Sequence, residues 1–154
     1  MKKLSCEVLS ALQGKTLVTA ESLTGGGIGA ELTAISGSSA VYKGGVISYT
    51  DAVKKSVLGV PEWALRAYGA VSAPVAATMA SGVRELLHAD VAVSVTGLAG
   101  PGGDDYGNPV GTVFIGYDDG EHGEVRCYAF SGSREEIRNQ TIEEALKLIL
   151  SNCK

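Results

Sequence analysis

Short apolar runs alternate with amphipathic segments along most of this chain, and the alternation limits the folds open to it. The runs 16–20 and 91–95 are short and apolar enough to be buried strands. The segment 73–87 instead repeats its apolar residues at helical spacing. Strands that alternate with helices favour a parallel sheet that helices cover on both faces.

The end of the chain departs from this alternation, because two apolar runs are joined directly by the turn 118–120. They are expected to form an antiparallel hairpin. We therefore expect an α/β fold, a single-domain α/β/α sandwich over 1–154, with a mostly parallel sheet and an antiparallel hairpin near the C-terminus. The expected helices are 2–13, 25–35, 51–58, a short one opened by Pro61, 73–87 and 134–150, and the expected strands are 16–20, 46–49, 91–95, 110–117 and 124–130.

Composition excludes several classes of partner. The 154 residues are 45% hydrophobic and 19% charged, which is typical of a globular domain. A net charge of −4 without a basic cluster, and only 6% aromatic residues, argue against nucleic-acid binding. No stretch approaches the roughly 20 apolar residues of a membrane span, so no membrane partner is expected.

Cysteine and histidine usage points to the cytoplasm and away from metals. Three cysteines without CxxC spacing fit a reducing compartment, and Glu7 and Gln13 interrupt any signal-like apolar run near the N-terminus. The two histidines lie far apart, so we expect no metal site. The chain has no Walker loop and no acidic residue placed for a dinucleotide ribose, so we expect no cofactor.

Glycines gather where a binding site is expected. Of the 21 glycines, many fall in 25–29, 37–45 and 97–107, near the ends of predicted strands. In open α/β sheets, ligands bind beyond the carboxyl ends of the strands. The loop 96–109 follows a buried strand, and its glycines are able to form an anion-binding nest of backbone N–H groups. The alternative is a mobile surface loop.

The first strand-to-helix corner reads ESLTGGG, with Ser22 as a candidate nucleophile. The N–H groups of Thr24, Gly25 and Gly26 would then bind an anion or form an oxyanion hole. The alternative is that Ser22 or Thr24 is only a helix N-cap, and this stretch alone favours the cap.

A serine nucleophile needs a base, and neither histidine lies near a predicted catalytic loop. Lys54 follows a predicted strand and is the remaining candidate, provided that burial lowers its pKa. Tyr49 ends that strand and is a candidate proton relay or substrate contact. The alternative is that Lys54 is an ordinary solvated helix residue.

Arg134 and Arg138 lie one turn apart at the start of the last helix. Either residue is suited to contact a phosphate. Glu135 and Glu136 beside them make surface ion pairing equally credible.

Several motifs, in order and spacing, resemble one known family. The residues are AESLTGG, GSSAVYKGGVISY, the lysine five residues after that tyrosine, LGV, YGAVS, VTGLAGPGG, NPVGTVFIG and FSGSREEIR. They resemble the CinA C-terminal domain family, in its stand-alone form, over about Leu4 to Leu150. The resemblance implies a nicotinamide-nucleotide amidase that converts nicotinamide mononucleotide and water into nicotinic acid mononucleotide and ammonia without a metal.

The resemblance also assigns roles to residues. Ser22 matches the nucleophile, Lys54 the base and Tyr49 an active-site partner. Arg138 matches a substrate-binding arginine. Thr96 and the residues after it match the substrate-binding loop, for which we name Gly97, Ala99, Gly100 and Gly102.

Asp51 stands where the family more often has asparagine, and a carboxylate near Lys54 would favour the protonated amine. Two alternatives to catalysis therefore stay open: a non-catalytic pyridine-nucleotide-binding module, and a scaffold whose glycines serve packing. We also expect a homo-oligomer.

Overall fold

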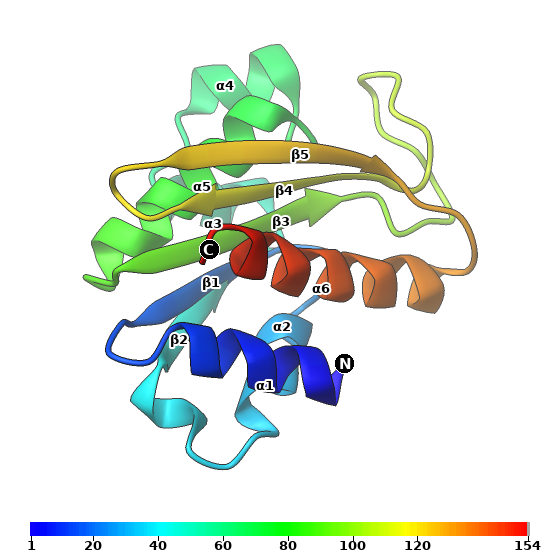
Figure 1. Cartoon of the computed structure of the whole chain (residues 1–154). Coiled ribbons are helices and arrows are strands. Elements are labelled where there is room, and N and C mark those ends of the chain that lie inside the picture. The colour runs from blue at the N-terminus through cyan, green and yellow to red at the C-terminus, as the bar shows by residue number, and fades with distance from the viewer. Residues whose placement is uncertain (154) are drawn as a thin grey trace.

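A single five-stranded sheet of order β2-β1-β3-β4-β5 runs through the centre of the protein (Figure 1). The computed structural model describes residues 1–153. β1 pairs in parallel with both β2 and β3, whereas β4 is antiparallel to β3 and to β5, so β4 alone runs against the other four. The strands are β1 (Leu17–Glu21), β2 (Tyr42–Ile47), β3 (Val91–Gly97), β4 (Thr112–Asp118) and β5 (Gly123–Ala129).

Helices cover both faces of this sheet, which confirms the predicted α/β/α fold (Figure 1). α1, α2 and α6 lie on one face and α3, α4 and α5 on the other. None of the helices in residues 1–153 is both long and apolar enough to cross a membrane. The helices are α1 (Lys2–Ala11), α2 (Gly27–Thr33), the 3₁₀ turn η1 (Ser38–Ala40), α3 (Asp51–Ser56), α4 (Glu62–Tyr68), α5 (Ala73–Leu86) and α6 (Arg134–Ser151).

The strand pleat sorts the side chains into two separate cores. Val91, Val93 and Val95 of β3 pack toward α1, α2 and α6, while Ala92 between them packs toward α5. Successive strand residues point to opposite faces, so a strand buried on both faces is apolar throughout. This explains why 91–95 was recognisable as a strand without alternation.

The connections place a topological switch at β1. The chain passes from β1 through α2 to β2 on one face, then through α3, α4 and α5 on the other face to β3. β2 and β3 therefore flank β1, and the carboxyl ends of all three strands meet at one edge. Such a switch leaves a crevice beyond the strand ends, where ligands bind in open α/β sheets.

β2 lies earlier in the chain than the predicted strand 46–49. The first residues of β2 were not predicted as a strand, because Gly44 and Gly45 have a low strand propensity. Gly45 faces Thr19 of β1 so closely that a Cβ there would collide with the threonine hydroxyl. The glycine thus permits the close approach of β2 to β1.

Thr50, rather than Asp51, caps α3. Its hydroxyl accepts a hydrogen bond from the Val53 N–H at 3.4 Å, and Asp51 is the first helical residue. The carboxyl group of Asp51 is therefore not needed for the cap and lines a cavity instead.

Candidate active site

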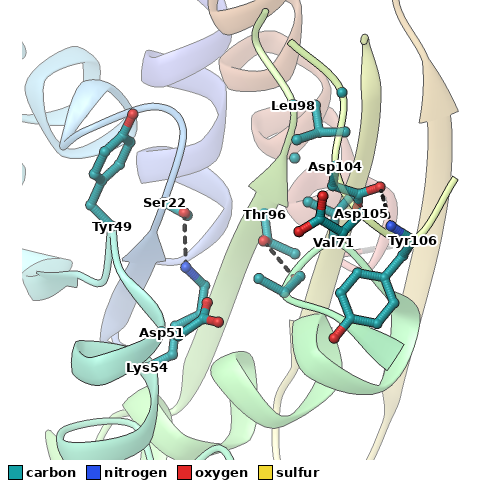
Figure 2. A pocket seen from close by; sticks show the side chains of 13 residues that line it. Ser22, Tyr49, Asp51, Lys54, Val71, Thr96, Leu98, Asp104, Asp105 and Tyr106 are labelled. Carbon is teal, nitrogen blue, oxygen red and sulfur yellow. Dashed lines mark hydrogen bonds between the residues drawn. The ribbon is translucent and has the colours of Figure 1, made fainter. Parts of the chain in front are cut away.

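A cavity of about 440 Å³ opens at the carboxyl ends of β1, β2 and β3. Ser22 follows β1, Tyr49 and Lys54 follow β2, and Thr96 and Gly97 close β3. Figure 2 shows these side chains around the cavity. The structure thus brings together all three predicted catalytic residues and two of the predicted substrate-binding residues.

Ser22 and Lys54 form a direct pair inside this cavity. The Lys54 Nζ donates to the Ser22 Oγ at 3.0 Å (Figure 2). It also donates to the Ser48 carbonyl oxygen at 2.7 Å. Both side chains are buried, Lys54 with only 1% of its surface exposed. The Ser22 N–H donates to the Val95 carbonyl, which fixes the serine to β3. The nucleophile and base predicted from the sequence are therefore in contact.

Burial lowers the pKa of Lys54 below its ordinary value, because the charged amine has lost most of its water. Asp51, one helical turn earlier, acts in the opposite direction and raises this pKa in part. Asp51 thus has the expected effect on the Lys54 pKa, but the opposite effect of burial is larger. The neutral amine beside the serine hydroxyl is therefore more accessible than in a solvated lysine.

The Glu21 carboxylate is a functional feature that the sequence reasoning missed. It is buried at 2% exposure and receives four hydrogen bonds. Oε1 accepts from the Thr24 hydroxyl at 2.7 Å and the Ile28 N–H at 2.9 Å, and Oε2 accepts from the Thr19 hydroxyl and the Gly29 N–H, each at 3.1 Å. The Glu21 carboxylate thus lies at the N-terminus of α2.

The turn that follows Ser22 contains Thr24, Gly25 and Gly26, whose anion binding stays a prediction. None of the three lines the cavity. Thr24 is fully buried against Glu21, and the two glycines adopt positive φ angles of 57° and 100°, which most side chains avoid. They shape the corner rather than the cavity wall. The N–H groups of Leu23 and Thr24 have no acceptor within residues 1–153.

The loop after β3 contributes less than predicted. The Thr96 hydroxyl donates to the Ala70 carbonyl at 2.9 Å, and Gly97 lines the cavity. Ala99 is buried in the core, and neither Gly100 nor Gly102 lines the cavity. Leu98, which bonds to Thr112 and Gly111, still lines the cavity, whereas the next residue, Ala99, packs into the hydrophobic core.

A second part of the same loop forms the cavity wall that the prediction missed. Asp104, Asp105 and Tyr106 line the cavity, and the Tyr106 hydroxyl lies 2.9 Å from the Arg66 carbonyl oxygen of α4 (Figure 2). Burial would raise the pKa of Asp104, but hydrogen bonds from Asn108 and Tyr106 outweigh it and hold that pKa below its usual value. The wall therefore carries negative charge.

Neither arginine lines the cavity, and the predicted phosphate contact stays a prediction. Arg138 donates to the Leu23 carbonyl at 2.9 Å and the Thr24 carbonyl at 3.2 Å, so it braces the nucleophile turn and does not line the cavity. Arg134 donates to the Gly100 carbonyl and to the Tyr49 hydroxyl. No sequence signal indicated either pairing, since the partners lie more than 30 residues away.

The donors suited to metals are scattered. Within residues 1–153, histidine, cysteine, aspartate and glutamate side chains form no group of three or more that is able to hold a metal ion.

Sequence comparisons point to one family. A family model described as the CinA C-terminal domain matches residues 1–153. A CinA-like protein of Salinibacter ruber is 47% identical over 138 residues, which are 87% of this chain and 34% of the relative. A CinA-like protein of a Synechococcus strain is 59% identical over 102 residues, which are 66% of this chain and 24% of the relative. The chain thus spans about a third or less of these curated relatives.

Solved structures agree over nearly the full length. The crystal structure of a competence-damaged protein (CinA) superfamily protein from Klebsiella pneumoniae has a TM-score of 0.96 and 33% identity, with 99% of this chain and 96% of that chain covered. The competence/damage inducible protein CihA from Agrobacterium tumefaciens has a TM-score of 0.96 and 36% identity, with 99% and 95% covered. Together with the family model, these likenesses show that the chain belongs to the CinA C-terminal domain family.

Proposed function

We propose that this protein is an amidohydrolase that deamidates nicotinamide mononucleotide to nicotinic acid mononucleotide and ammonia. The observation that carries the proposal is the buried Lys54 amine 3.0 Å from the Ser22 hydroxyl, in a cavity at the topological switch. A neutral amine in that place is a base for a serine nucleophile. The family resemblance supplies the choice of substrate.

The reaction proceeds by acyl transfer. Lys54 takes the Ser22 proton while the Ser48 carbonyl holds one of its N–H groups. The Ser22 Oγ attacks the carboxamide carbon, and a C–O bond forms. The C–N bond then breaks, the nitrogen takes a proton from Lys54, and ammonia leaves. Water, deprotonated by Lys54, hydrolyses the resulting ester and restores the serine.

Two features support the choice of this substrate. The N–H groups of Leu23 and Thr24, which follow the nucleophile, have no acceptor within residues 1–153 and are candidates to bind the oxyanion. The cavity is lined by the carboxyl groups of Asp51, Asp104 and Asp105, and the pyridinium ring of the substrate is a cation. These carboxyl groups complement the pyridinium ring but not the phosphate group of the nucleotide.

Ammonia release from nicotinamide mononucleotide tests the proposal. Ser22→Ala and Lys54→Met are expected to lower kcat by more than about 10³-fold, because each removes half of the reacting pair. Lys55→Met is the matched control, since Lys55 is exposed and next in the chain. Near-wild-type turnover by a folded Ser22→Ala or Lys54→Met protein would refute the assignment.

The second candidate is a non-catalytic pyridine-nucleotide-binding module. The observation that favours it is the Asp51 carboxyl group, which acts to keep the Lys54 amine charged. Stabilisation of the wild-type protein by the mononucleotide, with no release of ammonia, selects this function.

A further inference from the structure

Arg134, the first residue of α6, connects the cavity residue Tyr49 to the loop after β3, which is distant in the sequence. Its Nη1 donates to the Gly100 carbonyl oxygen at 2.6 Å, and its Nη2 donates to the Tyr49 hydroxyl at 3.2 Å. Gly100 belongs to the loop after β3, whereas Tyr49 follows β2. One planar guanidinium thus contacts both segments.

Tyr49 needs such a support. It lines the cavity, yet 58% of its surface is exposed, and Arg134 is the sole hydrogen-bond partner of its hydroxyl within residues 1–153. An exposed side chain without other contacts samples several rotamers. The phenol therefore depends on the arginine for a fixed position.

Arg134 is itself held in place from two sides. The short bond to Gly100 anchors one end of the guanidinium. A capping box fixes the first turn of α6, in which the Ser133 hydroxyl accepts from the Glu136 N–H and the Glu136 carboxylate accepts from the Ser133 N–H. The bond to Gly100 and the capped first turn of α6 thus hold Arg134 in place.

We propose that Arg134 is a positioning residue, which holds the Tyr49 phenol at the cavity mouth for the deamidation reaction. The inference rests on the proposed function for its effect on rate. The guanidinium donates to the phenol oxygen, so the phenol hydrogen points to another acceptor and is available to a substrate. Arg134 does not line the cavity itself and acts through Tyr49.

A double-mutant cycle tests this coupling. Arg134→Met, Tyr49→Phe and the double variant are compared with wild type for kcat and KM in ammonia release. Arg126→Met is the matched control, because Arg126 lies on β5, pairs with Glu124 at the surface and donates to the Ser151 hydroxyl of α6.

Each single variant is expected to lower kcat/KM by about tenfold, as is typical for the loss of a hydrogen bond to a charged group. The double variant is expected to lose about tenfold as well, since both changes break the same contact. A loss of about a hundredfold in the double variant means that the residues act independently and overturns the proposal. An Arg134→Met protein with wild-type kcat/KM overturns it too.

A spectroscopic readout separates this proposal from the proposed function. With ¹³C-labelled tyrosine, the ζ-carbon signal of Tyr49 is assigned by its absence in Tyr49→Phe. It is expected to shift in Arg134→Met and to stay in place in Arg126→Met, whether or not the protein is active. If the wild-type protein releases no ammonia, the proposed function fails. The Tyr49 signal still shows whether Arg134 positions the phenol. An unchanged Tyr49 signal in Arg134→Met overturns this positioning role.

Discussion

Lys54 is the residue on which the proposed chemistry depends most. Its amine is withdrawn from water at 1% exposure and contacts a hydroxyl and a backbone carbonyl. A buried amine loses hydration that favours its charged form, so its pKa falls and a neutral base becomes accessible. The same burial that costs folding free energy therefore creates the reactive group.

The pH dependence of activity follows from this residue. Deprotonation of Lys54 activates Ser22, so kcat/KM rises with pH through the lowered pKa of Lys54. Asp51 raises that pKa in part, so Asp51→Asn removes a charge that favours the proton. The acid limb of the pH profile is expected to move to lower pH, as measured by kcat/KM for ammonia release.

Asp105→Asn is the matched control for this shift, because Asp105 also lines the cavity but does not contribute to the Lys54 pKa. An acid limb that stays in place in Asp51→Asn, or moves equally in both variants, would contradict the assigned role of Asp51.

Sequence reasoning predicted the Ser22–Lys54 pair but not the residues that support it. Ser22 and Lys54 were reached because motifs in order and spacing resemble a family. The pairing of Arg138 with the Leu23 and Thr24 carbonyls spans over a hundred residues and leaves no local pattern. Glu21 was missed because a glutamate before a serine carries no sign that four donors surround it.

At the scale of elements, the β1–α2 corner is built around Glu21. Its two oxygens collect donors from β1, from the glycine turn and from the first turn of α2. Buried backbone N–H groups are costly without acceptors, and this carboxylate satisfies two of them. The corner therefore holds Ser22 at the exit of β1.

Glu21→Gln is expected to destabilise the protein by about 1–3 kcal/mol, because the amide N–H₂ replaces an oxygen that accepts two hydrogen bonds. Urea unfolding measures the loss. Glu7→Gln, on the exposed face of α1, is the control. Equal stability of the two variants would show that the carboxylate is not needed for the corner.

The loop wall of the cavity is set by its contact with α4. The Tyr106 ring covers Gly69, where an added Cβ would lie 2.6 Å from the ring. Gly69→Ala is expected to displace Tyr106 and raise KM for the nucleotide. Gly59→Ala is the matched control, since Gly59 has a similar φ, 72° against 78°, but open space around it. An equal KM in both variants would refute this role of Tyr106.

Element prediction failed where glycine replaces the usual signals. β2 contains Gly44 and Gly45 at positions where β-branched residues are typical, so its first half was not recognised. β3 was recognised because four apolar residues within 91–95, interrupted only by Ser94, fit a strand buried on both faces. Helix α6 was recognised from its spacing, and its bounds differ by a single residue from the prediction.

The whole molecule brings the reacting groups together through its topology. Ser22 and Lys54 are 32 residues apart and meet because β1 and β2 end at the same edge of the sheet. The order of alternating elements made it possible to predict that edge of the sheet. It did not make it possible to predict the side-chain contacts across that edge. Assembly into a homo-oligomer stays a prediction.

Ligand binding is expected to stabilise the whole fold. Ser22→Ala keeps the cavity but not the nucleophile, so nicotinamide mononucleotide should raise its Tm without being consumed. At a concentration of 100 times Kd the gain is about 2.7 kcal/mol. A Tm that does not respond to the nucleotide in either wild type or Ser22→Ala would favour the scaffold alternative.

The most direct test of the central claim is a rapid-quench measurement of covalent intermediates by peptide mass spectrometry. Wild-type protein and Ser22→Ala are mixed with excess nicotinamide mononucleotide, quenched within a turnover and digested. We expect the peptide that contains Ser22 to gain the mass of the nucleotide minus ammonia, and Ser22→Ala to show neither this adduct nor turnover. An adduct on a different residue, or undiminished turnover by Ser22→Ala, would contradict a serine activated by a buried neutral lysine.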